Sequence, residues 1–192
     1  MRKVIYCMMV SLDGYVEAPG GDIGWSSPDE EVHAFCNDMA RGMGGALYGR
    51  GLYENMSAFW PTADQEPDAP EVVVDFARTW RATPKYVFSR TLTQVGWNST
   101  LMTGDLEAEV TRLKRQDGGD LEVGGATLAH SLVRLCLVDE FRLLVHPIVL
   151  GRGRRFFPEL ATPVETRLVE SRTFDSGVLY LRHQVVRPTH AG

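Results

Sequence analysis

Two adjacent glycines between a strand pattern and a helix pattern constrain the fold of this chain more than any other feature. Residues 120–123 alternate polar and apolar, as in a strand, and leucines recur at helical spacing across residues 128–135. Gly124 and Gly125 lack a Cβ, so the backbone can turn sharply there and another molecule can lie against it. The first helical turn, with the hydroxyl of Thr127, favours an anion such as pyrophosphate. The unit predicts either a phosphate site or simply a tight turn.

A second glycine turn between a strand and a helix occurs earlier in the chain. Gly49-Arg50-Gly51 follows a short strand and leads into a helix, and Ser89-Arg90 ends another strand. Arg50 and Arg90 can each hold a phosphate through two hydrogen bonds. Together these groups describe a dinucleotide with an extra phosphate better than a mononucleotide. The alternative is that both arginines are solvated surface cations.

Alternating strand and helix patterns followed by a β-rich end predict one α/β domain over residues 1–192. A central, mainly parallel sheet is expected from Val4–Val10, Ala46–Tyr48, Lys85–Phe88, Leu121–Val123 and Arg142–Val145. Further strands are expected over residues 97–102, 164–173 and 178–186, the last two forming an antiparallel edge. Helices are expected over residues 71–81 and 105–116, the second capped by Thr103 or Gly104.

A long loop is predicted from Ser11 to Trp25, because four glycines and one proline disfavour regular structure there. Loops of this length in small domains are often lids over a ligand, although a merely decorative loop remains the alternative. The next residues predict a helix that reaches Arg41. Its expected cap is Ser27, with Glu30 completing a capping box.

The composition and the short motifs of the chain exclude several classes of function. The net charge of −5 gives no electrostatic footprint for nucleic acid, and no apolar run reaches transmembrane length. Residues 1–10 predict a first strand and not a signal peptide. Three cysteines and five histidines are scattered, which predicts no metal site and buried thiols in a reducing cytoplasm. No Rossmann fingerprint, Walker motif, nucleophile elbow or HExxH occurs.

Six motifs follow one another in a characteristic order: Trp25…Pro28…Glu30, Tyr48-Gly49-Arg50…Tyr53-Glu54, Lys85-Tyr86-Val87-Phe88-Ser89, Val123-Gly124-Gly125, Val145-His146 and Phe157-Pro158. This series resembles dihydrofolate reductase read from end to end. It is more similar still to the C-terminal reductase domains (RibD) of bifunctional riboflavin-biosynthesis deaminase–reductases. The stretches 11–14 and 147–153 are typical of these domains. No deaminase zinc motif is present, so the resemblance is to the reductase part standing alone.

The resemblance implies a three-layer α/β/α fold with NADPH across the C-terminal edge of the sheet. Gly49 to Gly51 would hold the pyrophosphate and the 2′-phosphate, and Ser89-Arg90 would flank the adenosine. The stretch 124–128 would hold the nicotinamide half, with a cis peptide between its two glycines, under the loop that ends at Trp25. The implied cofactor-binding residues are Val10, Gly49, Arg50, Gly51, Leu52, Ser89, Arg90, Val123, Gly124, Gly125, Ala126, Thr127 and Leu128.

The implied catalytic residues are Glu30, Asp29, Trp25 and Asp13. Glu30 falls where dihydrofolate reductase has the carboxylate that binds pterin, and Asp29 is the second choice. The helix dipole at this place lowers the pKa of a carboxyl group, which suits gripping a cationic or N–H-bearing heterocycle. The alternative is that these acids only cap the helix. The threonine partner of that carboxylate is here Val145, which leaves folate open as the substrate.

The sequence therefore predicts an NADPH-dependent reductase of a small heterocycle by hydride transfer from the nicotinamide. The substrate resembles that of (phosphoribosylamino)uracil reductase or of dihydrofolate reductase, and the alternative is a non-catalytic dinucleotide-binding module of the same fold. Arg152, Arg154 and Arg155 either meet a ribosyl phosphate or form a solvated basic loop. A homodimer is predicted because the C-terminal edge strands carry Leu168, Val169, Val178, Leu179, Leu181 and Val185.

Overall fold

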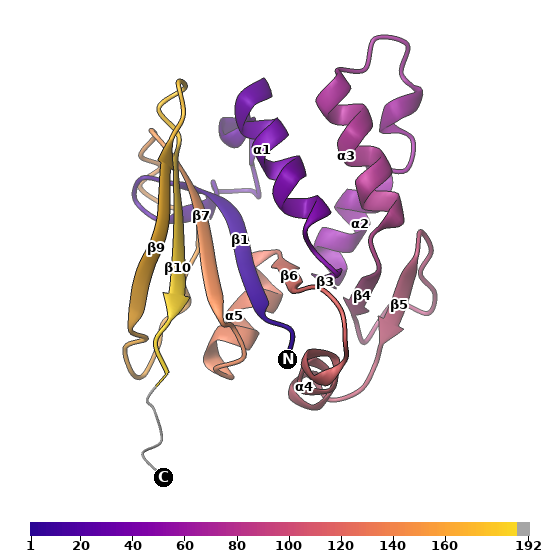
Figure 1. Ribbon diagram of the computed structural model, residues 1–192, viewed down its shortest axis with the longest axis vertical. Coiled ribbons are helices and arrows are strands. Elements are labelled where there is room, and N and C mark those ends of the chain that lie inside the picture. Colours follow the sequence, from indigo (N-terminus) through magenta and orange to yellow (C-terminus); the bar gives the residue numbers. More distant parts are fainter. Residues whose placement is uncertain (188–192) are drawn as a thin grey trace.

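Eight strands form one sheet in the order β5-β4-β3-β6-β1-β7-β10-β9 in the computed structural model, which describes residues 1–187 (Figure 1). The strands are β1 Val4–Ser11, β3 Gly45–Gly49, β4 Lys85–Phe88, β5 Ser99–Met102, β6 Leu121–Gly124, β7 Glu140–His146, β9 Thr166–Thr173 and β10 Leu179–Val185. The first six strands in this order pair parallel, and β10 pairs antiparallel with both of its neighbours, β7 and β9. The predicted mainly parallel sheet with an antiparallel C-terminal edge is confirmed.

Helices cover both faces of this sheet. They are α1 Glu30–Arg41, α2 Arg50–Phe59, α3 Glu71–Ala82, α4 Leu106–Arg115 and α5 Ala126–Arg134, with a short 3-10 helix η2 at Ala63–Gln65. In β1, Val4 and Tyr6 pack in the cluster under α4 and α5, whereas Cys7 and Met9 pack in the cluster under α1. Because β1 is buried from both sides, its sequence is a continuous apolar run. The result is three layers.

Two helix caps differ from the sequence expectation. Asp29, and not Ser27, is the N-cap of α1, and its carboxylate accepts a hydrogen bond from the amide of Val32 at 2.8 Å. Glu30 is then the first helical residue, two positions before the third helical position that a capping box requires. Asp105 caps α4 in the same way, in place of Thr103 or Gly104. An aspartate immediately before the first turn reaches that turn's amides directly.

The stretch from Ser11 to Trp25 contains regular structure, so the prediction of an irregular loop is wrong. Its strand β2, Tyr15–Glu17, pairs antiparallel with β8, Arg154–Arg155, and the 3-10 helix η1 covers Gly24–Ser26. Gly153 permits the pairing, because a Cβ at that position would lie 2.0 Å from the carbonyl oxygen of Glu17. The glycine-rich segment is therefore anchored along part of its length.

Candidate functional site

The chemically promising segments meet at one edge of the sheet. The strands β3, β4, β6, β1 and β7 are parallel, so their carboxyl ends all point to this edge. The ends of β3, β4 and β6 are level with one another, and those of β1 and β7 are level and extend further. Both glycine turns, the Ser89-Arg90 pair and the loops after β1 and β7 follow these ends directly. Ligands of open α/β sheets bind in the crevice outside such carboxyl ends.

Close packing against Leu52 favours glycine at both positions of the Gly124-Gly125 turn. A Cβ at Gly124 would lie 2.6 Å from Cδ2 of Leu52, and one at Gly125 would lie 3.3 Å from Cβ of Leu52. Gly125 turns the chain with φ +83°, a conformation that glycine adopts without strain. The expectation of a cis peptide bond here is wrong, because the peptide bonds of the described chain are all trans.

The expected cofactor residues divide into buried and accessible side chains. Four of them pack in the core and leave only backbone for a ligand: Val10, Val123, Ala126 and Leu128. Gly124 is also buried, whereas Gly49, Leu52, Ser89 and Gly125 are half-buried. Arg50, Gly51, Arg90 and Thr127 are exposed at the edge. Direct side-chain recognition is therefore restricted to Arg50, Leu52, Ser89, Arg90 and Thr127.

Two of the accessible groups are brought together through Thr91. Nη1 of Arg50 donates to Oγ1 of Thr91 at 3.5 Å, and Oγ of Ser89 accepts from the Thr91 amide at 3.2 Å. Nε of Arg50 also lies 3.9 Å from the carboxylate of Glu54. Arg90 has no hydrogen bond or ion pair within residues 1–187. This part of the edge therefore presents two arginines, one of them uncompensated.

The basic loop after β7 is largely engaged by its own neighbours. Arg154 pairs with Glu17 at 2.8 Å and donates to Oγ1 of Thr127 at 3.3 Å. The guanidinium of Arg155 lies 5.3 Å from the centre of the Tyr15 ring, a cation–π arrangement. These contacts place Arg154 at the first turn of α5, beside the glycine turn.

A pocket of about 300 Å³ lies where η1, the start of α1, the end of β7 and the β9–β10 turn meet. Its lining residues are Trp25, Ser27, Asp29, His146, Pro147, Ile148, Ser176 and Val178. The rings of Trp25 and His146 meet edge to face, with centroids 5.7 Å apart. The pocket thus combines an aromatic wall with two titratable side chains.

Hydrogen bonding and burial set the charge of those two side chains. The amide of Val32, followed by the side chain of Ser176, lowers the pKa of Asp29 below its usual value. Burial lowers the pKa of His146, and the nearby charge of Asp29 opposes this shift in part. At neutral pH the pocket therefore holds an ionised carboxylate and a mainly neutral imidazole.

The four expected catalytic residues do not come together. Trp25 and Asp29 line the pocket, whereas Glu30 lies outside its lining. Asp13 accepts hydrogen bonds from the amides of Leu150 and Gly151 at 3.0 and 2.7 Å. Burial acts to raise the pKa of Asp13, but these bonds and the Ser11 hydroxyl lower it overall. Asp13 therefore holds the loops after β1 and β7 together.

Sequence reasoning missed several lining residues. His146 had a usable signal, because it is the last residue of a parallel strand that ends at this edge. Ser176 and Val178 had none, because an antiparallel hairpin brings them back to the edge and local sequence does not reveal its position.

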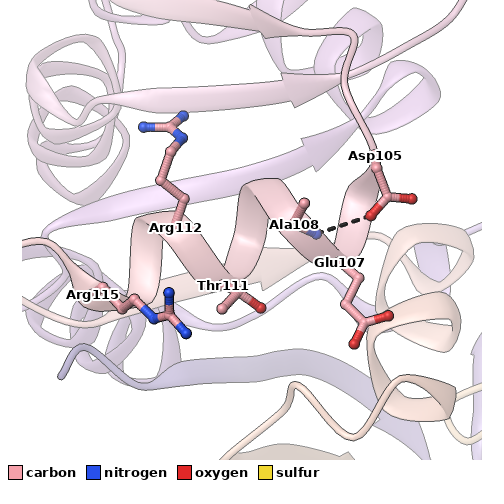
Figure 2. Close-up of a pocket in the computed structure, with 6 residues that line it drawn as sticks. All are labelled: Asp105, Glu107, Ala108, Thr111, Arg112 and Arg115. Carbon is pink, nitrogen blue, oxygen red and sulfur yellow. Dashed lines mark hydrogen bonds between the residues drawn. The ribbon is translucent and has the colours of Figure 1, made fainter.

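A larger hollow, of about 470 Å³, lies along the outer face of α4 (Figure 2). All six lining residues come from that helix and its cap: Asp105, Glu107, Ala108, Thr111, Arg112 and Arg115. The hollow is a surface groove along a single helix and contains none of the sheet-edge groups.

Metal and membrane features are absent from the described part of the chain. Residues 1–187 contain no cluster of three His, Cys, Asp or Glu that could hold a metal ion; His190, one of the five scattered histidines, lies outside them. Across the same residues, no helix has the length and apolar character needed to cross a bilayer.

Known proteins share this architecture. The family described as the RibD C-terminal domain matches residues 2–180. The chain is 32% identical over 183 residues to the uncharacterized protein YyaP of Bacillus subtilis (strain 168), covering 94% of this chain and 93% of YyaP. A solved structure from Shewanella sp. PV-4, provisionally named a riboflavin biosynthesis protein, superposes with TM-score 0.76 at 22% identity, covering 96% and 99% of the two chains.

Two further solved structures carry reductase names. A deaminase/5-amino-6-(5-phosphoribosylamino)uracil reductase of Thermotoga maritima gives TM-score 0.66 at 15% identity, over 96% of this chain and 57% of the other. Dihydrofolate reductase of Enterococcus faecalis, complexed with NADP(H), gives a TM-score of 0.63 at 13% identity, covering 96% of this chain and 97% of the other. The expected dihydrofolate reductase-like fold is confirmed. The chain belongs to the RibD C-terminal domain family.

Proposed function

We propose that this protein is an NADPH-dependent reductase of a small heterocyclic substrate. The observation that carries the proposal is the common position of its parts at one sheet edge. The Trp25–Asp29 pocket lies at the end of β7, and the two glycine turns, Arg50 and Arg90 follow the ends of the parallel strands β6, β3 and β4 in the same sheet. Membership of a family that includes reductases supports the reaction class.

The residues present fit a dinucleotide. The first turns of α2 and α5 have glycine N-caps with no side-chain cap, so backbone N–H groups are available to phosphate oxygens. The exposed Arg50 and Arg90 suit the 2′-phosphate. When bound, the nicotinamide supplies a hydride. Asp29 would hold an N–H-bearing part of the substrate, and Trp25 would limit the access of water.

The first test is consumption of NADPH with candidate substrates: dihydrofolate, the (phosphoribosylamino)uracil and a dihydropterin without a glutamate tail. Steady oxidation with one of them supports a reductase. The second candidate function is a binding module without turnover, which is favoured by Val145 at the position of the dihydrofolate reductase threonine. Tight NADPH binding without oxidation across the whole panel would favour that module.

We predict that NADPH is preferred over NADH because of Arg50 and Arg90. Charge-assisted hydrogen bonds from arginine to a 2′-phosphate contribute about 1.5–3 kcal/mol each. Replacing both arginines by alanine should weaken NADPH binding about tenfold or more and leave NADH nearly unchanged. Calorimetric titration of both cofactors measures this. The control is Arg115→Ala, which removes an exposed arginine of α4; equal losses for the two cofactors would show that Arg50 and Arg90 do not recognise the phosphate.

We also propose a homodimer formed through the C-terminal strands. Every residue of β9 is exposed, including Leu168 and Val169, and Figure 1 shows β9 and β10 at one end of the sheet. Leu179 and Leu181 of β10 are half-buried, whereas Val178 is buried and does not contribute to this surface. A second copy would cover the exposed edge. Sedimentation at micromolar concentration should give twice the monomer mass, and a mass near 21.4 kDa would contradict the dimer.

The cysteines support a proposed location in the reducing cytoplasm. All three are free. Burial raises the pKa of Cys36 to about 12, which keeps that thiol protonated and unreactive. Cys136 is exposed, contrary to the expectation of three buried thiols. An exposed free thiol is compatible with a reducing compartment.

A further inference from the structure

The pocket contains one buried polar group that the proposed roles do not use. His146 is 6% exposed, and its Nε2 is buried without a hydrogen-bond partner among residues 1–187. Buried polar atoms are normally satisfied, and an exception calls for an explanation in function or in a missing ligand. The ring stands edge-on to Trp25 in the pocket, so a bound heterocycle is the natural partner for it.

Among the described residues that line the pocket, Asp29 and His146 are the two titratable side chains, and the ordinary pKa of His146 is the nearer to neutral pH. Hydrogen bonds lower the pKa of Asp29, so its carboxylate stays ionised. The acids on neighbouring elements are already engaged. Glu31 pairs with Arg172 at 2.6 Å, and Asp13 accepts from the amides of Leu150 and Gly151.

We propose that His146 donates the proton that accompanies hydride transfer, a role that rests on the proposed reductase function. The substrate carbon of a C=N or C=O group accepts the hydride, and the dihydronicotinamide is thereby oxidised. The electron pair of the broken π bond takes the proton from the imidazolium of His146, leaving a neutral imidazole. Solvent protonates His146 again before the next turnover. Asp29 stabilises the imidazolium by its negative charge.

A nuclear magnetic resonance titration of the protein without cofactor tests the electrostatic part. The ring proton of His146 should titrate with a pKa below 6.5, and Asp29→Asn should lower that pKa further. His33 is the internal reference, because burial also lowers its pKa but its neighbouring acid is Asp75. If Asp29→Asn leaves the titration of His146 unchanged, the two groups are not coupled and the proposal fails.

The kinetic test uses a substrate that the wild-type protein reduces. His146→Gln should lower kcat about 10²-fold or more and leave the KM for NADPH unchanged. Wild-type kcat should fall as pH rises through the pKa of His146, and this limb should disappear in the variant. His183→Gln, on β10 and outside the pocket, is the matched control.

The two possible failures are distinguishable. Full kcat and an unchanged pH limb in His146→Gln, with active wild-type protein, would overturn the proton donor and leave the reductase standing. If wild-type protein reduces no compound of the panel, the reductase fails and this inference fails with it. If His146→Gln does not fold, as judged by near-ultraviolet circular dichroism, the titration of Asp29→Asn decides alone.

Discussion

Asp29→Asn is expected to lower turnover about 10²-fold, whereas Glu30→Gln should change it less than about twofold. The reason is position: both residues are exposed, but Asp29 lines the pocket and Glu30 does not. Asparagine is as good an N-cap as aspartate, so the substitution preserves the hydrogen bond to Val32 and the start of α1. The loss therefore reports on the charge of the carboxylate and not on the helix.

Steady-state kinetics with the substrate identified in the panel measures both variants, and thermal unfolding checks that both fold. NADPH affinity should be unaffected in both, since neither carboxyl lies at the arginine end of the site. A large loss in Glu30→Gln with a small loss in Asp29→Asn would reverse the assignment and restore the residue that the family resemblance implies.

The two carboxyls show why this part of the site was not predictable. Counting from Trp25 aligns Glu30 with the carboxylate of dihydrofolate reductase, and the sequence pattern places the cap at Ser27. The structure starts α1 two residues later than that cap implies, which makes Asp29 the cap. A shift of this size rotates the first turn and changes which carboxyl lines the pocket. Sequence patterns rarely fix helix boundaries to that precision.

The sheet was predictable because its strong signals are local. Residues 4–10 form a continuous apolar run, and glycine turns mark where parallel strands end and helices begin. The pairing of β2 with β8 was not predictable, because it joins Tyr15 to Arg155 across most of the chain and depends on Gly153 lying against Glu17. The same holds for Ser176, whose place in the pocket depends on the return of the β9–β10 hairpin.

Glu122 shows a further limit of local pattern. Its alternation with Leu121 and Val123 identifies a strand correctly, and such alternation is typical of a sheet with one face in water. Strand β6 instead lies in the middle of the sheet, where Glu122 is paired in register with Ile5 and Ala46. The carboxyl is half-buried and has no hydrogen bond within residues 1–187. Burial raises the pKa of Glu122 to about 7, and Arg142 offsets this only in part.

Glu122→Gln is accordingly expected to stabilise the protein at alkaline pH and not at acid pH. Because folding raises the pKa of Glu122 from 4.5 to about 7, the folded state holds its proton more tightly than the unfolded state. The contribution of Glu122 to the free energy of unfolding is fully present below about pH 4 and is lost as pH rises through about 7. The full shift corresponds to about 3 kcal/mol, and partial exposure of the carboxyl reduces the expected effect to about 2 kcal/mol.

Urea unfolding of wild-type and Glu122→Gln protein between about pH 4 and pH 8 measures this difference. The gain in the free energy of unfolding should be near zero at the acid end and should reach about 2 kcal/mol at the alkaline end. Glu107→Gln, an exposed carboxyl on α4, is the matched control and should show no such trend. A gain that is the same at both ends would mean that improved packing, and not the removal of a buried charge, stabilises the variant. No gain at the alkaline end would show that Glu122 is ionised in the folded protein without cost.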